Sequence, residues 1–220
     1  MNKPKNFNLI TILTVVYVVC MLLSNIVATK QFALGPWSVP AGTIVFPITY
    51  ILSDVFSEVY GYKWSRITSW MAAGMNLFMC IIFALTIIIP GPVWFASETQ
   101  AAMEIVLGNT PRLVVAGLVA YVVGDWVNDW IFERMKASER IYIGMKSHFF
   151  QRAIISSFFG ELLDSTIFIL LAFVGTMPIE QLPSMIIVQV IAKTLYEIGI
   201  FPVTNKIMKE VRKYENLSVV

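Results

Sequence analysis

Seven carboxylates and one lysine lie in otherwise apolar stretches of this 220-residue chain. Three pairs are spaced i,i+4 and one pair is spaced i,i+3, so each pair lies on one face of a helix. The pairs are Asp54/Glu58, Asp125/Asp129, Lys193/Glu197 and Glu161/Asp164. A charged group at the centre of a membrane costs about 2.5–3.5 kcal/mol to insert, and it normally faces a partner or a water-filled cavity. We therefore expect these side chains to line a common polar interior.

One lysine cannot neutralise seven acids. Several carboxylates must be protonated, hydrated or matched by the donors of a ligand. A simpler interpretation is that structural hydrogen bonds and a Lys193–carboxylate bridge hold a bundle together, but this accounts for one pair and not for the whole set. Asp129 and Glu58 lie nearest the predicted cytoplasmic edge, and their simplest alternative is pairing with a loop cation such as Lys63 or Arg134.

The composition indicates a membrane protein. Hydrophobic residues make up 57% of the chain and charged residues 14%, against about 45–50% and about 25% in soluble domains. A spanning helix needs about 20 mostly apolar residues, and six such stretches lie between Gly- and Pro-containing breakers. They are residues 9–28, 41–60, 67–89, 113–132, 153–174 and 185–203, and Thr110-Pro111 is the break expected before the fourth. We expect an all-α, polytopic protein in which residues 1–220 form a single transporter domain of six transmembrane helices.

Lysine and arginine residues set the expected orientation. With six spans, thirteen of the sixteen basic residues lie on the side of the two termini, Lys30 and Arg112 lie on the other side, and Lys193 lies within a span. Cytoplasmic loops carry an excess of Lys and Arg, so both termini are predicted to face the cytoplasm. Residues 134–152 are expected to lie along the membrane surface, with His148 as an ordinary surface residue. The net charge of +2 is too small to indicate a nucleic-acid partner.

Metal, cofactor and catalytic patterns are missing from the sequence. Cys20 and Cys80 fall inside apolar runs and are expected to be buried small hydrophobes. With one histidine and no ligand-spaced Cys/His pairs, neither a metal site nor a cofactor is predicted. The Gly-x-Gly-Asp signature of intramembrane aspartyl proteases and the zinc-protease pattern His-Glu-x-x-His are both absent. The sequence therefore predicts no enzyme.

Five stretches resemble one known family. They are "LLSNIVATK", "FPITYILSDVFSEVYG", "GDWVNDWIFERMK", "FFGELLDSTIFILLAF" and "AKTLYEIGIFP". In this order, and over nearly the whole chain, they resemble the queuosine-precursor transporter family, also catalogued as a vitamin-uptake transporter family. The resemblance implies a six-helix protein of the inner membrane. It would import 7-cyano-7-deazaguanine, 7-aminomethyl-7-deazaguanine or queuine for the tRNA modification queuosine.

The buried carboxylates suit this class of ligand. A deazaguanine presents an N–H and an exocyclic amine side by side, and one carboxylate accepts hydrogen bonds from both. Asp164 or Glu161 is predicted to accept these two hydrogen bonds. The neighbouring carbonyl group of the base needs a donor such as Lys193 or Asn128. The ring face needs an aromatic side chain. The predicted substrate-binding residues are Asn25, Asp54, Asp125, Trp126, Asn128, Glu161, Asp164, Lys193, Tyr196 and Glu197.

The competing interpretation is the substrate-binding membrane subunit of an energy-coupling-factor vitamin importer. Such subunits are also small and six-helical, but they dock on a separate transmembrane partner and on ATPases. Both interpretations imply a small-molecule substrate and contact with membrane lipid, and both are compatible with a homo-oligomer. The sequence leaves open which deazaguanine is preferred and whether transport is coupled to protons.

Overall fold

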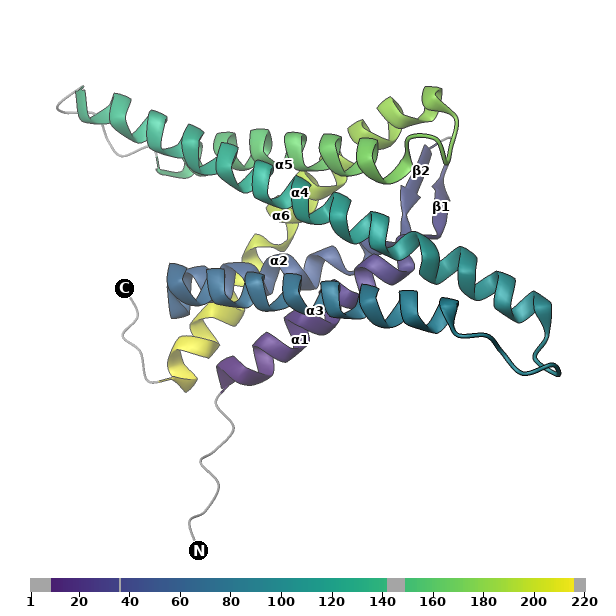
Figure 1. Cartoon of the computed structure of the whole chain (residues 1–220). Coiled ribbons are helices and arrows are strands. Elements are labelled where there is room, and N and C mark those ends of the chain that lie inside the picture. Colours follow the sequence, from purple (N-terminus) through teal and green to yellow (C-terminus); the bar gives the residue numbers. More distant parts are fainter. Residues whose placement is uncertain (1–8, 36, 142–148, 216–220) are drawn as a thin grey trace, which may run out of the picture. The chain divides into compact units, whose positions relative to one another are not determined.

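The computed structural model describes residues 9–35, 37–141 and 149–215 (Figure 1). Its main elements are α1 (Leu9–Val27), β1 (Gln31–Leu34), β2 (Trp37–Pro40), α2 (Phe46–Val55), α3 (Tyr62–Ile88), α4 (Ser97–Ile141), α5 (Phe149–Phe173) and α6 (Leu182–Tyr214). Short 3₁₀ turns cover Ala41–Ile44 and Ile179–Gln181. The strands pair in a two-stranded sheet that the all-α prediction lacked. Residues 142–148 of the predicted surface segment, with His148, lie outside the described residues.

Four of the described helices are long and apolar enough to cross a membrane, which confirms a multi-pass helical protein. The candidate spans are Leu9–Val27, Lys63–Ile88, Ser97–Asn128 and Ile155–Phe173. They correspond to the first, third, fourth and fifth predicted spans. The second corresponds to α2 with its flanking turns, and the sixth corresponds to α6. Six crossings and two cytoplasmic termini stay predictions.

The second predicted span is not one uniform helix. A 3₁₀ turn precedes the ten residues of α2, and a π-helical turn, Phe56–Tyr60, follows them. Gly61 ends this segment with a φ of 87°, a left-handed value that glycine adopts without strain. π-helical turns are uncommon and often occur at functional sites. The turn contains Glu58, one of the predicted intramembrane acids.

The predicted break at Thr110-Pro111 is wrong. α4 is continuous over 45 residues, with Pro111 inside it, so the helix begins at Ser97 and not at residue 113. Proline lacks the N–H that would bond the carbonyl four residues earlier, but membrane helices tolerate this loss when other groups satisfy the local backbone. Thr110 Oγ1 donates to the carbonyl oxygen of Val106 at 3.1 Å, one turn earlier. The carbonyl that Pro111 leaves without its usual donor is that of Leu107, so this bond lies beside the missing one and does not replace it.

The chain divides into two compact units, each assembled from segments that are far apart in sequence. Unit 1 comprises Met1–Lys30, Pro40–Pro111 and Leu195–Val220, and unit 2 comprises Gln31–Val39 and Arg112–Thr194. Two helices contribute to both units. The boundary falls after Pro111 in α4 and before Leu195 in α6.

The core of unit 1 joins its first three helices. A buried cluster is formed by Tyr17 of α1, Leu52 of α2, Phe56 of the π-helical turn and Ala72 of α3. The rings of Tyr17 and Phe56 meet edge to face, with centroids 5.7 Å apart. The last part of α6 is tied to the same unit, because the Tyr60 hydroxyl donates to the Glu215 carboxylate at 2.9 Å.

In unit 2, Arg112 holds the end of α5. Its Nε donates to the carbonyl oxygen of Leu171 at 2.7 Å, and its Nη2 donates to the carbonyl oxygen of Val174. The last carbonyls of a helix have no partner within the helix and carry partial negative charge, so a guanidinium stabilises this end. Arg112 is one of only two basic residues on the predicted outer side, and this cap gives it a structural role there.

Candidate functional site

Asp164 and Lys193 form an ion pair within unit 2. Lys193 Nζ of α6 donates to Asp164 Oδ2 of α5, and the two side chains are 6% and 27% exposed. The pair therefore joins two helices at a position that little solvent reaches. A buried charge that loses its partner is strongly destabilising, so each residue constrains the other.

Two glycines bring α4 and α5 together beside this pair. A Cβ at Gly124 would lie 2.9 Å from the carbonyl oxygen of Gly160 and 2.9 Å from Asp164 Cβ. A Cβ at Gly160 would lie 2.9 Å from the carbonyl oxygen of Gly124 and 2.9 Å from Asn128 Cβ. Small residues at such a crossing let two membrane helices approach closely. At this crossing the Cα and Cβ atoms of Asp164 lie against α4, and those of Asn128 lie against α5.

Further buried polar side chains of unit 2 escaped the sequence analysis. Gln189 is 1% exposed and precedes Lys193 by one helical turn, while Ser165 is 0% exposed and follows Asp164. Within the described part of the chain, Gln189 Oε1, Ser165 Oγ and Thr194 Oγ1 have no hydrogen-bond partner. Buried polar atoms are nearly always hydrogen-bonded, so each such atom needs a further explanation such as water or a ligand. The i,i+4 spacing of Gln189 and Lys193 was the sequence signal available for Gln189.

The other predicted residues of unit 2 differ in burial. Asp125, Asn128 and Glu161 are partly buried, whereas Trp126 is 67% exposed. The structure thus gathers several predicted polar residues in unit 2, and it gives Trp126 a surface position. Their roles in binding stay predictions.

The remaining predicted residues belong to unit 1. Asn25 Nδ2 of α1 donates to Asn76 Oδ1 of α3 at 2.7 Å, and Asn76 is 4% exposed. Asn76 was missed, although it is an amide in the middle of a predicted span. Asp54 is exposed and Tyr196 is 39% exposed. The side chain of Glu197 lies outside the described part of the structure.

The arrangement in unit 2 offers one partly buried anion and one buried cation that contact each other. Such a pair presents an acceptor and a donor side by side, and the partnerless polar atoms lie within one turn of it in sequence. A planar polar molecule with adjacent donor and acceptor groups would match this set. Among the described residues, no three His, Cys, Asp or Glu side chains are grouped closely enough to hold a metal ion.

Comparison with known proteins adds the family. The model of a family described as "Putative vitamin uptake transporter" matches residues 40–207, well over half of the chain. The "Probable queuosine precursor transporter" of Bacillus subtilis (strain 168) is 22% identical over 161 residues, which cover 71% of this chain and 66% of that protein. The match thus spans just under two thirds of the relative's length. No solved structure matches the chain.

Proposed function

Because the chain belongs to the vitamin uptake transporter family, we propose that it imports a queuosine precursor across the inner membrane. Membership of this family and the four candidate spans make it a multi-pass membrane transporter. The substrate proposed is a 7-deazaguanine base: the cyano precursor, the aminomethyl precursor or queuine. The name of the Bacillus subtilis relative and the chemistry of unit 2 support this choice.

The observation that carries the proposal is the buried Asp164–Lys193 pair. Along its pairing edge, a deazaguanine presents a carbonyl oxygen, a ring N–H and an exocyclic amine in that order. A carboxylate accepts from the ring N–H and the amine together, and an ammonium group donates to the adjacent carbonyl oxygen. Asp164 and Lys193 supply these two groups next to each other. The pair thus complements the whole edge of the base.

The ion pair also allows both proposed binding groups, the Asp164 carboxylate and the Lys193 ammonium group, to stay charged before a substrate binds. Without a base, each charge satisfies the other inside the protein. When a base enters, the donors on its edge replace Lys193 at the Asp164 carboxylate, and Lys193 moves to the carbonyl oxygen of the base. Neither charge is left unpaired during this exchange, which avoids the large penalty of an isolated buried charge.

The partnerless polar atoms beside the pair support the same interpretation. The Gln189 carbonyl oxygen and the Ser165 hydroxyl are fully buried and have no partner among the described residues. The Gln189 carbonyl oxygen can accept a hydrogen bond from the base, and the Ser165 hydroxyl can donate or accept one. A hydrogen bond from a bound base or an ordered water to either group would be favourable, because a buried polar atom without a partner is costly.

Uptake of labelled precursor tests the role of Asp164. In Asp164→Asn the amide nitrogen cannot accept, and we expect uptake to fall about tenfold or more, because hydrogen bonds to charged groups contribute about 1.5–3 kcal/mol. The wild type should prefer the natural precursor to an analogue that lacks the exocyclic amine, and Asp164→Asn should lose most of this preference. If the variant is present at normal levels and both its uptake and its preference are unchanged, Asp164 does not bind the ring N–H and the exocyclic amine of the substrate.

Transport by the chain alone distinguishes this function from that of a vitamin-importer subunit. We expect uptake in a host that lacks energy-coupling-factor ATPases and their transmembrane partner. Binding to the purified chain without uptake in such a host would instead favour the subunit interpretation.

A further inference from the structure

Two of the described helices, α4 and α6, carry the same pattern: a glycine followed three residues later by a proline. The pattern covers residues 108–111 in α4 and 199–202 in α6, and both prolines lie inside their helix. These are also the two helices that contribute to both compact units. Pro111 is the last α4 residue of unit 1, and Gly199 follows the α6 boundary by about one helical turn. The pattern therefore occurs close to where each helix connects the units.

Each proline weakens its helix at one backbone hydrogen bond. Proline has no N–H, so Pro111 and Pro202 leave the carbonyl oxygens of Leu107 and Ile198 without their usual donors. Sharp bends in helices occur mainly at proline and at glycine-containing positions. A change in bend angle therefore meets less resistance at these two points than in the fully hydrogen-bonded parts of the same helices.

Packing does not require the glycine of either motif. A Cβ at Gly199 would meet no atom within 4 Å, and a Cβ at Gly108 would lie 3.8 Å from Ile87 Cδ1, an ordinary contact. Gly124 differs, because a Cβ there would lie 2.9 Å from a facing backbone oxygen. Glycine gives the backbone more conformational freedom than any other residue and weakens a helix interior. The glycine beside each proline therefore favours a flexible point and not a close helix contact.

Near these motifs, side-chain contacts fix α4 and α6 to the units that they enter. Directly after the α4 motif, Arg112 donates to carbonyl oxygens at the end of α5. On α6, Lys193 pairs with Asp164 in unit 2, and the far end of the helix is held in unit 1 by the bond from Tyr60 to Glu215. Since these contacts hold the neighbouring segments, a change in helix direction concentrates at the motifs.

We propose that residues 108–111 and 199–202 are hinges at which α4 and α6 bend, so that unit 1 and unit 2 move as separate bodies during transport. Alternating access largely uses such movements of whole groups of helices around a fixed substrate site. The Asp164–Lys193 pair stays intact during this motion, because both residues belong to unit 2. The inference rests on the proposed transport function, but it does not depend on which substrate is carried.

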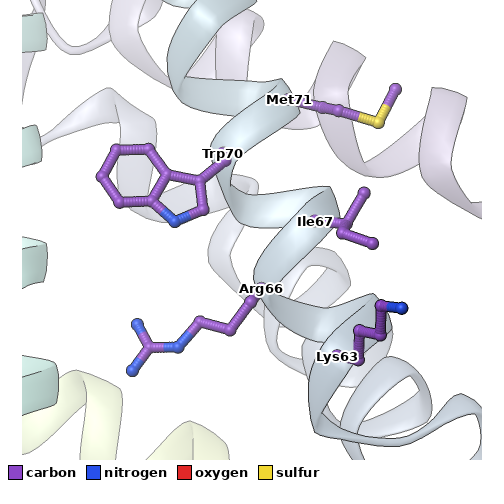
Figure 2. Close-up of a pocket in the computed structure, with 5 residues that line it drawn as sticks. All are labelled: Lys63, Arg66, Ile67, Trp70 and Met71. Atoms are coloured by element: carbon purple, nitrogen blue, oxygen red, sulfur yellow. The ribbon is translucent and has the colours of Figure 1, made fainter.

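Distances between two spin labels test the hinges in the full-length protein without a substrate. One pair of labels, at Lys63→Cys and Glu180→Cys, spans the two units, and a control pair, at Lys63→Cys and Lys209→Cys, stays within unit 1. All three positions are exposed. Figure 2 shows that the Lys63 and Arg66 side chains point to different sides of α3, so a label at residue 63 does not displace Arg66. The two buried native cysteines are replaced with alanine in every labelled protein.

We expect two distance populations for the pair that spans the units and one for the control pair. Pro111→Ala and Pro202→Ala each restore one backbone hydrogen bond, so each should shift the ratio of the two populations by about fivefold. The matched control is Pro183→Ala in the first turn of α6, where an N–H would have no partner within the helix. It should leave the ratio unchanged. Uptake of labelled 7-cyano-7-deazaguanine should fall several-fold in both hinge variants and not in this control.

A single distance for the spanning pair in the wild type overturns the proposal, as does an unchanged ratio in both hinge variants. An equal shift in Pro183→Ala, or two populations for the control pair, also overturns it, because the motion would then lie elsewhere. If the proline variants do not fold, Gly199→Ala decides the question, since its Cβ has open space and alanine stiffens the helix. It should shift the ratio in the direction expected of the proline variants. If the distances respond as expected but 7-cyano-7-deazaguanine is not taken up, the hinges stand and the proposed substrate is wrong.

Discussion

Asp164 accepts a hydrogen bond from Lys193, 29 residues further along the chain, and Lys193 is the more deeply buried of the two. Among the described residues, Lys193 is the only one of the membrane-depth ionisable groups that is nearly inaccessible to solvent. Its ammonium group pairs with the Asp164 carboxylate, and variants of this pair allow its effect on stability to be measured separately from its effect on transport.

Removing one member of the pair should destabilise the protein more than removing both. Lys193→Gln leaves a partly buried carboxylate without its cation, and we expect a loss of about 3 kcal/mol. The double variant Asp164→Asn/Lys193→Gln removes both charges of this pair and should recover most of this loss, although it should not transport. Thermal unfolding of the purified proteins in detergent measures the first effect and uptake measures the second. Equal stability of the single and double variants would contradict the coupling.

Gly124→Ala and Gly160→Ala should each push α4 and α5 apart. The new Cβ would lie 2.9 Å from the backbone oxygen of the facing glycine, and the helices can relieve this clash only by separating. We expect each variant to lose about 1–3 kcal/mol of stability and to transport less, because Asp164 lies at the same crossing. The measurement is thermal unfolding together with uptake.

Gly74→Ala is the matched control for these glycines. It also lies inside a spanning helix, but a Cβ there meets no atom within 4 Å. Alanine favours helix over glycine, so this variant should be neutral or slightly more stable. If Gly74→Ala and Gly124→Ala behave alike, the close crossing does not determine the loss.

Gln189→Leu should lower uptake without lowering stability. Leucine is close in volume to glutamine and removes a buried carbonyl that has no partner among the described residues, so the unfolding temperature should stay the same or rise. If the carbonyl serves the substrate, uptake should fall several-fold. The control is Gln100→Leu in unit 1, which should leave uptake unchanged. A stable Gln189→Leu variant with normal uptake would exclude Gln189 from the site.

Arg112→Gln should loosen the end of α5. It removes a charged donor from the carbonyl oxygens of Leu171 and Val174, and we expect a loss of about 1–2 kcal/mol. Hydrogen exchange should rise in the last turn of α5 before it rises elsewhere in that helix. Arg112→Lys should restore part of the protection. Lys30→Gln, at the other basic residue of the predicted outer side, should have no effect on α5.

The helical body of the protein could be predicted from hydropathy, because apolar stretches of about 20 residues form helices in a membrane whatever their neighbours are. The position of breaks could not be predicted equally well. Thr110-Pro111 resembles a helix boundary in sequence, but in the structure Pro111 lies within α4. A proline ends a helix only when nothing else compensates for the missing bond, and this depends on local contacts that the sequence does not display.

The ionisable residues of the proposed site could be identified from the sequence, but the carboxylate that pairs with Lys193 could not. A single lysine among seven acids had to have a carboxylate partner, yet several were equally suitable by depth. Asp164 is the partner because α5 and α6 place the two side chains together. The Gly124–Gly160 crossing and the burial of Gln189 likewise depend on which helix faces meet, and residue spacing within one helix does not determine that.

The discontinuous makeup of unit 1 has a consequence for biosynthesis. The ribosome delivers Leu195–Val220 only after all of unit 2, although these residues complete a unit that begins with Met1–Lys30. The first three helices are therefore synthesised well before the last segment of their own unit. The hydrogen bond from Tyr60 to Glu215 closes across 155 residues, so it can form only after Glu215 has been synthesised.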